Sequence, residues 1–285
     1  MNPPNCRFCQ SPLATTMADL GIASAPNQLH PHDTDTATQR AQALNVFICD
    51  SCFLVQSPSH RYDRPFFVSD DDCAASSRQM RARDYTDMMI DRFGLTPENL
   101  VIQHVGSDGD LLPSFQRANI PVLGIPPYPH IAESFGGDFA ERLTAEDKQA
   151  DLFISHNNLD SVPDLNDFVL GIQTVLKPDG VFTLEFPHML RLIQHKPSKL
   201  TRHNRVTYFS FLTVERIFSQ HGLTLFDVEE IPAHGGSLRV FGRHHGYRKL
   251  PVTPQVTALR DQEKAAGLDK LETYQKFGQP PNGQN

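Results

Sequence analysis

Long apolar runs are missing from this chain, which nowhere approaches the roughly 18 consecutive apolar residues of a membrane-spanning helix. Residues 1–10 lack the basic and then apolar order of a secretory signal. Basic residues are in deficit, with 26 Lys and Arg against 33 Asp and Glu and a net charge of -7. These absences argue against a membrane protein and against nucleic-acid binding, which needs a basic surface. We therefore expect a cytoplasmic protein.

Cysteines are few, five in all, but four of them form two closely spaced pairs. Cys6-Arg-Phe-Cys9 and Cys49-Asp-Ser-Cys52 each place two thiols on one tight turn. Two such pairs complete a tetrahedral sulfur shell for Zn²⁺, and the alternative is chance or a redox pair. Four thiolates leave no open coordination position, so the pairs predict a structural zinc ion. Cys73 has no pair and no assigned role.

Length and composition allow one large domain or two smaller ones, since 285 residues with 39% hydrophobic content can build a substantial core. Strand patterns then alternate with helix patterns, with Gly or Pro at the joins, which indicates a doubly wound, mainly parallel sheet. The expected strands are 101–105, 121–125, 150–154 and 181–185, and the expected helices are 78–93, 111–118, 130–135, 165–176 and 212–221. Two paired strands at 223–231 and 237–243 and a final helix at 254–267 follow.

These patterns divide the chain into four parts. They are a zinc-binding domain at 1–60, a linker at 61–78, a Rossmann-like domain at 79–250, and a C-terminal helix with a disordered tail at 251–285. Three consecutive Asp residues at 70–72 indicate that the linker is solvated.

A nucleotide-binding turn is the first functional candidate. The strand expected at 101–105 runs into Gly106, Asp108 and Gly109 before a helix, and glycines there let the backbone approach a cofactor at the carboxyl end of the strand. Gln103 occupies a position where an acid often sits. Asn157, which follows the third strand, is a further cofactor-binding candidate.

Six longer phrases occur further along the chain. They are V-P-D-L-N-D-F at 162–168, L-K-P-D-G-V at 176–181, E-F-P-H at 185–188, Y-F-S at 208–210, L-T-V-E-R at 212–216 and H-G-G-S-L-R at 234–239. Together with the cysteine pairs they resemble the S-adenosylmethionine-dependent deoxysugar 3-C-methyltransferases, which act on nucleotide-linked hexoses. The resemblance runs from Cys6 to about residue 277.

The resemblance implies a Rossmann-like class I methyltransferase core behind a zinc-binding domain, with S-adenosylmethionine as the methyl donor. It also implies a nucleotide-linked keto-sugar as the small-molecule substrate. A second α/β domain of the family is expected to be absent after the tail. In the family reaction a base removes a proton from the carbon next to a ketone, and the enolate then takes the methyl group from the sulfonium.

The chain departs from the family at positions that carry this chemistry. Of the family's cofactor turn only Asp108 and Gly109 remain. The acid that follows the family's second strand falls on Pro126, and a histidine before V-P-D-L falls on Ser161. These replacements predict a weakened site for S-adenosylmethionine.

The family's Y-H-E-H run, which supplies acid–base and enolate-binding side chains, falls on residues 202–205. Only His203 survives, and the base position holds Arg205, which stays protonated and cannot abstract a proton. Tyr208 and His234 complete the candidate catalytic set, and the alternative for His234 is a structural histidine.

We therefore interpret the chain as a methyltransferase-like protein whose C-methylation is weak or lost. One alternative is a non-catalytic subunit, a protein partner that pairs with and stabilises an intact relative. The other is a repurposed enzyme in which Arg202 and Arg205 hold an anionic small molecule. His188 and Glu185, at strand ends, are either site groups or structural ones.

Overall fold

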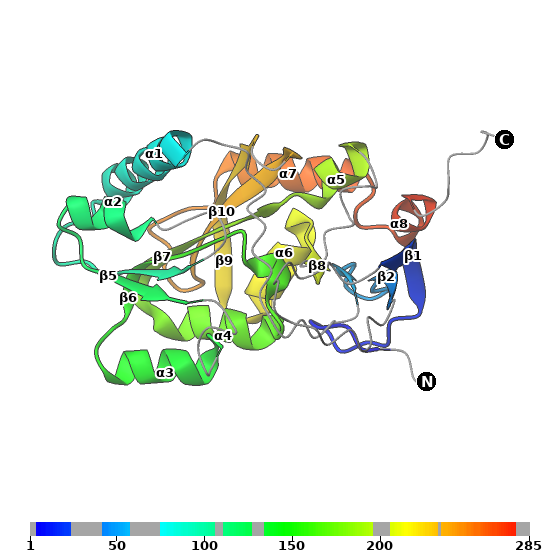
Figure 1. Cartoon of the computed structure of the whole chain (residues 1–285), viewed down its shortest axis with the longest axis horizontal. Coiled ribbons are helices and arrows are strands. Elements are labelled where there is room, and N and C mark those ends of the chain that lie inside the picture. The colour runs from blue at the N-terminus through cyan, green and yellow to red at the C-terminus, as the bar shows by residue number, and fades with distance from the viewer. Residues whose placement is uncertain are drawn as a thin grey trace, which may run out of the picture.

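The structure is a computed structural model that describes residues 4–23, 42–57, 75–105, 111–126, 134–195, 206–232 and 235–277. Two sheets organise these residues (Figure 1): six strands in the order β5-β4-β6-β7-β10-β9, and four in the order β1-β2-β3-β8. The strands are β1 Thr15–Ala23, β2 Gln42–Ile48, β3 Val55–Gln56, β4 Val101–His104, β5 Val122–Ile125, β6 Ala150–His156, β7 Leu176–Pro187, β8 Thr207–Tyr208, β9 Leu223–Ile231 and β10 Ser237–His244. The helices are α1 Ala75–Phe93, α2 Leu112–Arg117, α3 Gly137–Ala145, the 3-10 turn η1 Leu159–Ser161, α4 Leu165–Val175, α5 Met189–His195, α6 Phe211–Gln220, α7 Pro254–Ala265 and α8 Leu271–Phe277.

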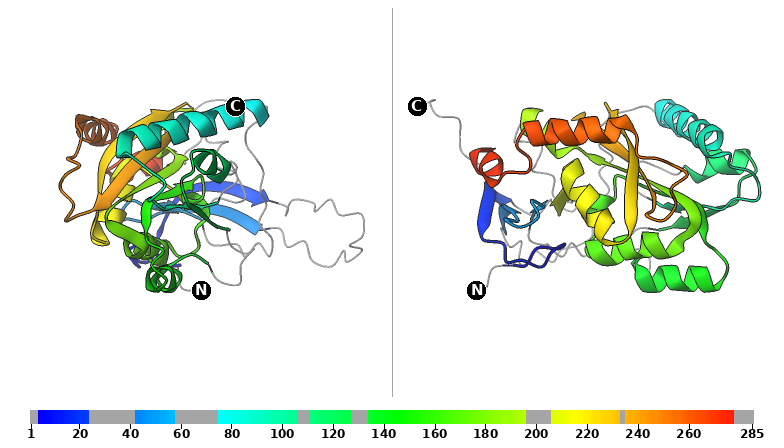
Figure 2. Two further views of the ribbon diagram at one scale, coloured as in Figure 1. Left: turned by 90° about the vertical axis from the view of Figure 1, so that its left-hand side faces the viewer. Right: turned by 180° about the vertical axis from the view of Figure 1, so that it is seen from behind.

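The larger sheet is mainly parallel. Its strands β5, β4, β6 and β7 run parallel, and β10 is antiparallel to both β7 and β9. Helices α1 and α2 cover one face, and α3, α4 and α6 cover the other (Figure 1 and Figure 2). Strands buried on both faces read as near-continuous apolar runs, and this is why the sequence pattern located them. The expected doubly wound, mainly parallel sheet is confirmed.

The smaller sheet joins two distant parts of the chain. Strand β2 pairs with β1 and β3, and β3 pairs in turn with β8, where Val55 lies opposite Tyr208. The sheet lies at one end of the molecule beside α8 (Figure 1), and Tyr274 of α8 stacks on Phe53 with ring centroids 6.4 Å apart. The sequence pattern predicted neither the hairpin of β1 and β2 nor the partnership with β8.

Strand β7 begins earlier than the sequence pattern predicts. The expected strand at 181–185 is preceded by Lys177-Pro-Asp-Gly180, which reads as a turn. In the structure this tetrapeptide lies inside β7 as an irregularity in the pairing with β6, between Ala150 and Leu152. A Cβ on Gly180 would lie 2.6 Å from the Ala150 carbonyl oxygen, so the close backbone approach requires glycine.

Two helix predictions need correction. The described part of the helix expected at 130–135 is not helical, and α3 instead begins at Gly137. The backbone N–H of Gly137 donates to Asp167 Oδ1 at 2.9 Å, so the start of α3 is held by a residue of α4. Helix α8 also follows the helix that was expected to be the last. Residues 61–74 of the linker and 278–285 of the tail lie outside the described residues.

Within the described part of the chain, no helix combines the length and the apolar character needed to cross a bilayer.

Candidate metal centre and cofactor edge

The four paired cysteines meet at one point beside the smaller sheet. Their sulfur atoms all lie within 4.8 Å of one another, with 3.6 Å between those of Cys6 and Cys52 and 3.4 Å between those of Cys9 and Cys49. Four sulfurs at ~2.3 Å from one central Zn²⁺ would lie about 3.8 Å apart. The donor set and the spacing therefore fit a tetrahedral zinc ion, as the sequence predicted.

Both cysteine pairs adopt the same turn. The backbone N–H of Gln10 donates to the Cys6 carbonyl at 3.0 Å, and that of Phe53 donates to the Cys49 carbonyl at 2.9 Å. Gln10 and Phe53, each next to the second cysteine of its pair, have positive φ values of 62° and 59°. A left-handed residue costs about 1–2 kcal/mol, and its presence in both turns indicates that the geometry around the sulfurs is specified.

The thiols share their protons unevenly. A hydrogen bond from Cys52 is the largest cause that lowers the pKa of Cys6 to about 4. Burial is the largest cause that raises the pKa of Cys49 to about 11, and the bond to Cys6 raises the pKa of Cys52. The cluster thus already favours a thiolate at Cys6, and the thiolate is the form that binds metal.

The carboxyl ends of β4 and β5 lie together, as the cofactor prediction requires. Gln103 Oε1 accepts a hydrogen bond from the backbone N–H of Leu111 at 3.0 Å, and the Val105 N–H donates to the Ile125 carbonyl at 2.9 Å. The side chain of Gln103 therefore ties together the two ends of the turn. Pro126 follows β5 and is exposed. Gly106, Asp108 and Gly109, the turn's own candidates, lie outside the described residues.

A buried histidine links β4 to the segment after β6. Asn158 Nδ2 donates to the His104 carbonyl at 3.1 Å, and His104 Nδ1 lies 3.2 Å from Ser155 Oγ. Burial lowers the pKa of His104 to about 4, so its ring is neutral at physiological pH. Asn157 itself has a positive φ of 52° and donates its backbone N–H to the Glu185 carbonyl at 2.8 Å. The structure thus places Asn157 at the same edge as Gln103.

The α1 face of the sheet carries a partly buried polar network around Glu185, and the sequence pattern did not identify its other members. Arg239 Nε donates to Glu185 Oε1 at 2.7 Å, and the Tyr85 hydroxyl lies 2.5 Å from Thr183 Oγ1. His156 Nδ1 lies 3.4 Å from the same carboxylate oxygen. Burial raises the pKa of Tyr85, which keeps it protonated. Glu185 is therefore held by partners within the fold, which fits its interpretation as a structural group.

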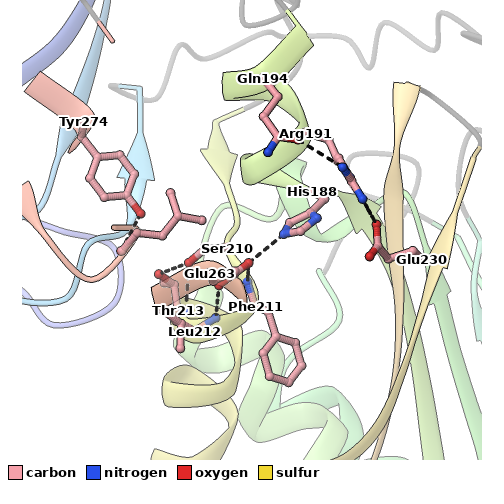
Figure 3. Close-up of polar contacts among 11 residues, drawn as sticks. His188, Arg191, Gln194, Ser210, Phe211, Leu212, Thr213, Glu230, Glu263 and Tyr274 are labelled. Atoms are coloured by element: carbon pink, nitrogen blue, oxygen red, sulfur yellow. Dashed lines mark hydrogen bonds and ion pairs between the residues drawn. The ribbon is translucent and has the colours of Figure 1, made fainter. Parts of the chain in front are cut away.

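His188, which directly follows β7, has a structural partner on the distant helix α7 (Figure 3). Its Nε2 lies 2.7 Å from Glu263 Oε1, and neither side chain is exposed. Glu263 also accepts from the backbone N–H groups of Phe211 and Leu212, at 2.7 and 2.9 Å. Glu263 thus caps α6 and holds the end of β7 at once.

Tyr208 lies in the smaller sheet and not at the carboxyl edge of the larger one. It is 4% exposed and packs among Met17, Ile48 and Tyr274. The remaining catalytic candidates, His203, Arg205 and His234, lie outside the described residues, as does Arg202. Their roles and that of Tyr208 stay predictions.

Three family models match successive parts of the chain. A model described as a zinc-binding domain matches residues 6–63, one described as a methyltransferase domain matches 102–228, and one described as a C-methyltransferase C-terminal domain matches 232–282. The third match covers β10, α7 and α8, the part of the chain that carries Glu263.

One curated relative is the C-methyltransferase NovU of Streptomyces niveus, which is 25% identical over an alignment of 289 positions that covers 95% of this chain and 68% of the relative. Among solved structures, the PH0226 protein of Pyrococcus horikoshii has a TM-score of 0.45 at 14% identity, covering 66% of this chain and 100% of that one. The glycopeptide N-methyltransferase MtfA, solved with sinefungin, has a TM-score of 0.42 at 12% identity, covering 57% and 94%. Neither structural likeness bears on substrate or cofactor.

Proposed function

We propose that this chain, which belongs to the family of C-methyltransferases with an N-terminal zinc-binding domain, binds S-adenosylmethionine weakly. We also propose that its methyl transfer to a nucleotide-linked keto-sugar is weak or lost. The observation that carries the proposal is the chemistry at the carboxyl ends of β4 and β5. Among described residues 101–105 and 122–126 there is no carboxylate, and Gln103 and Pro126 stand where acids are expected.

The cofactor bears an ammonium group and two ribose hydroxyls, which carboxylates bind through charge-assisted hydrogen bonds. Gln103 Oε1 keeps the bond to the Leu111 N–H that closes the turn, but it brings no charge. Loss of one charge-assisted bond costs about 1.5–3 kcal/mol, or roughly tenfold or more in affinity. Pro126 offers neither a charge nor an acceptor on its side chain, so both replacements weaken the binding of S-adenosylmethionine.

Proton abstraction is the second step that the substitutions affect. The family's base position holds Arg205, whose guanidinium stays protonated. Loss of a general base typically costs a factor of about 10²–10⁴ in rate. Ser161, where the family has a further histidine, donates its hydroxyl to the Asn158 carbonyl at 2.9 Å and is therefore engaged within the fold.

Calorimetric titration of the purified protein with S-adenosylmethionine tests the cofactor half of the proposal. We expect a dissociation constant well above that of an intact relative measured side by side. A low-micromolar constant would show that other groups compensate for the missing carboxylates, and the proposal of a weakened site would then be wrong.

Methyl transfer from labelled S-adenosylmethionine to a nucleotide-linked 4-keto-hexose tests the catalytic half. The assay compares wild type with a variant that rebuilds the family pattern through Gln103→Glu, Pro126→Glu, Ser161→His, Arg202→Tyr, Asn204→Glu and Arg205→His. We expect little or no turnover by wild type and more by the variant. Robust wild-type turnover would refute the proposal outright.

A non-catalytic partner subunit is the second candidate, because the chain keeps the core and the metal-binding cysteines but differs from the family at the positions that carry its chemistry. Capture of an intact relative from the native host would favour it. The third candidate, an enzyme that holds an anion through Arg202 and Arg205, is favoured if acidic small molecules bind and charge-neutral variants of those two residues abolish the binding.

A further inference from the structure

We propose that Gln56 is an outer partner of the zinc site and that it transmits metal binding to strand β8, so that zinc holds the segment 206–210 in place. The proposal rests on the zinc site and not on methyl transfer. It assigns a role to a residue that the sequence pattern did not single out.

The side chain of Gln56 contacts the cysteine cluster directly. Its Nε2 donates to Cys6 Sγ at 3.2 Å and to the Leu54 carbonyl at 3.4 Å, while its Oε1 accepts from the Arg7 backbone N–H at 2.9 Å. The residue is 1% exposed. A buried amide with both ends bonded is held in one orientation, so the N–H that faces the sulfur is specified.

The backbone of the same residue belongs to strand β3. Gln56 pairs with Thr207, its neighbour Val55 pairs with Tyr208, and the Ser57 N–H donates to the Val206 carbonyl at 3.0 Å. One residue therefore joins a metal-binding sulfur to β8 through side chain and main chain. Since β3 has only two residues, loss of the side-chain anchor weakens the whole pairing.

The segment 206–210, which contains β8, lies between the larger sheet and the zinc module, by which we mean the described residues 4–23 and 42–57. The Val206 N–H donates to the Asp160 carbonyl at 2.9 Å, and the Met189 N–H donates to the Phe209 carbonyl at 2.9 Å. The segment thus connects to the turn after β6 and to the end of β7. It directly follows residues 202–205, where the family carries its acid–base run.

The first cysteine pair has its own contacts with the same region. Arg7 Nη1 donates to the Pro163 carbonyl at 2.9 Å, and Asn166 Nδ2 donates to the Phe8 carbonyl at 2.9 Å. The first bond reaches the segment between η1 and α4, and the second reaches the first turn of α4. A metal that orders this cysteine pair would therefore also help to order the segments that lie beside the carboxyl ends of β6 and β7.

The physical reason for the role of Gln56 is charge. Four thiolates outweigh the two charges of Zn²⁺, so the cluster is anionic, and an N–H donor to a sulfur stabilises it. Loss of such an outer partner typically costs about 10–100-fold in metal affinity. A donor role and a packing role make opposite predictions for substitution by glutamate, which keeps the shape of Gln56 but replaces the N–H by an oxygen.

The first test is competition for zinc between the protein and a chromophoric chelator. We expect Gln56→Leu to lose about tenfold in affinity and Gln56→Glu to lose more, up to about 100-fold, because a carboxylate repels the thiolates. Gln116→Glu, which adds the same charge on the exposed part of α2, should match wild type. Gln56→Glu within twofold of wild type would overturn the proposal.

The second test needs no variant, so it holds even if the substitutions prevent folding. Amide hydrogen exchange is measured on the wild-type chain with zinc and after chelation. We expect exchange in 55–57 and 206–210 to rise by at least about tenfold, while the core strands β4 and β6 change little. Unchanged exchange in 206–210, or an equal rise throughout the chain, would overturn the proposed transmission. Neither test depends on S-adenosylmethionine or on turnover.

Discussion

The zinc module and the carboxyl edge of the larger sheet differ in how many of the residues implied by the family resemblance they contain. In the module all four ligands are present, and both turns around them adopt the same left-handed geometry. At the sheet edge the strands are in place, but Gln103 and Pro126 occupy positions where acids are expected. The four metal ligands are therefore in place, whereas a loss of chemistry at the sheet edge stays a prediction.

The physical demands on the two regions explain the difference. A structural zinc site is nearly all-or-none, because removal of one thiolate leaves an incomplete shell and loses metal-coupled folding energy. A parallel sheet needs only apolar packing and backbone pairing, and neither depends on a carboxylate at the end of a strand. Substitution at the edge therefore costs the fold little, whereas substitution in the module costs the fold directly.

The largest effect is expected from breaking the module. Cys49→Ser should abolish the binding of about one zinc ion per chain, loosen the first segment and lower thermal stability, since structural zinc contributes on the order of 10 kcal/mol or more to the folding of small metal domains. Metal analysis and thermal unfolding measure both effects. Cys73→Ser is the matched control and should keep its zinc. Wild-type protein purified without chelator and found free of zinc would contradict the prediction.

The next effect concerns a polar group that the scaffold does require. Glu263→Ala should destabilise the chain by about 3–5 kcal/mol, because His188 and the first N–H groups of α6 lose their buried acceptor. Chemical unfolding measures the loss. The control is Glu215→Ala, which breaks a partly exposed pair with Arg260 and should cost about 0–1 kcal/mol. Equal losses in both variants would show that the Glu263 contacts carry no special weight.

A pH effect comes third and tests the sheet edge itself. The pKa of His104 is lowered from 6.5 to about 4 by burial, so the unfolded chain binds this proton more readily than the folded one. Stability from this group is therefore complete above pH 6.5 and is lost as the pH falls toward 4, by up to about 3 kcal/mol.

His104→Phe should remove this part of the pH dependence while keeping a ring beside Phe135 and Phe168. The measurement is the free energy of unfolding between pH 4 and 7. Parallel pH profiles for the variant and wild type would mean that other groups set the acid sensitivity of this edge.

The smallest effect is a gain at the cofactor edge. Gln103→Glu should tighten S-adenosylmethionine binding by about tenfold, or ~1.4 kcal/mol, since it restores one charge and can still accept from the Leu111 N–H. Calorimetry measures the change, with Gln116→Glu as the charge control. An unchanged affinity would separate the cofactor site from this edge and remove the main support for the proposed function.

Local sequence pattern predicted much of the molecule, and it failed where a contact joins residues that are far apart in the chain. The apolar runs at 101–105 and 150–154 identified β4 and β6 because both faces of a parallel strand are covered. The start of α3 was missed because its first N–H bonds to Asp167, which is distant in sequence. Gly180 suggested a turn, although its small size instead permits a close approach of two strands.

The sequence by itself determined the metal centre and the layered sheet, because two short spacings and an alternation of apolar runs contain the necessary information locally. Tertiary structure alone decided that β8 pairs with β3 of the zinc module and that Gln56 donates a hydrogen bond to Cys6 Sγ. It also decided that the side chain of Glu263 pairs with that of His188. Each of these contacts joins residues that are far apart in the chain. A side chain's hydrogen-bond partner depends on which buried group the fold brings near, and no local period encodes that choice.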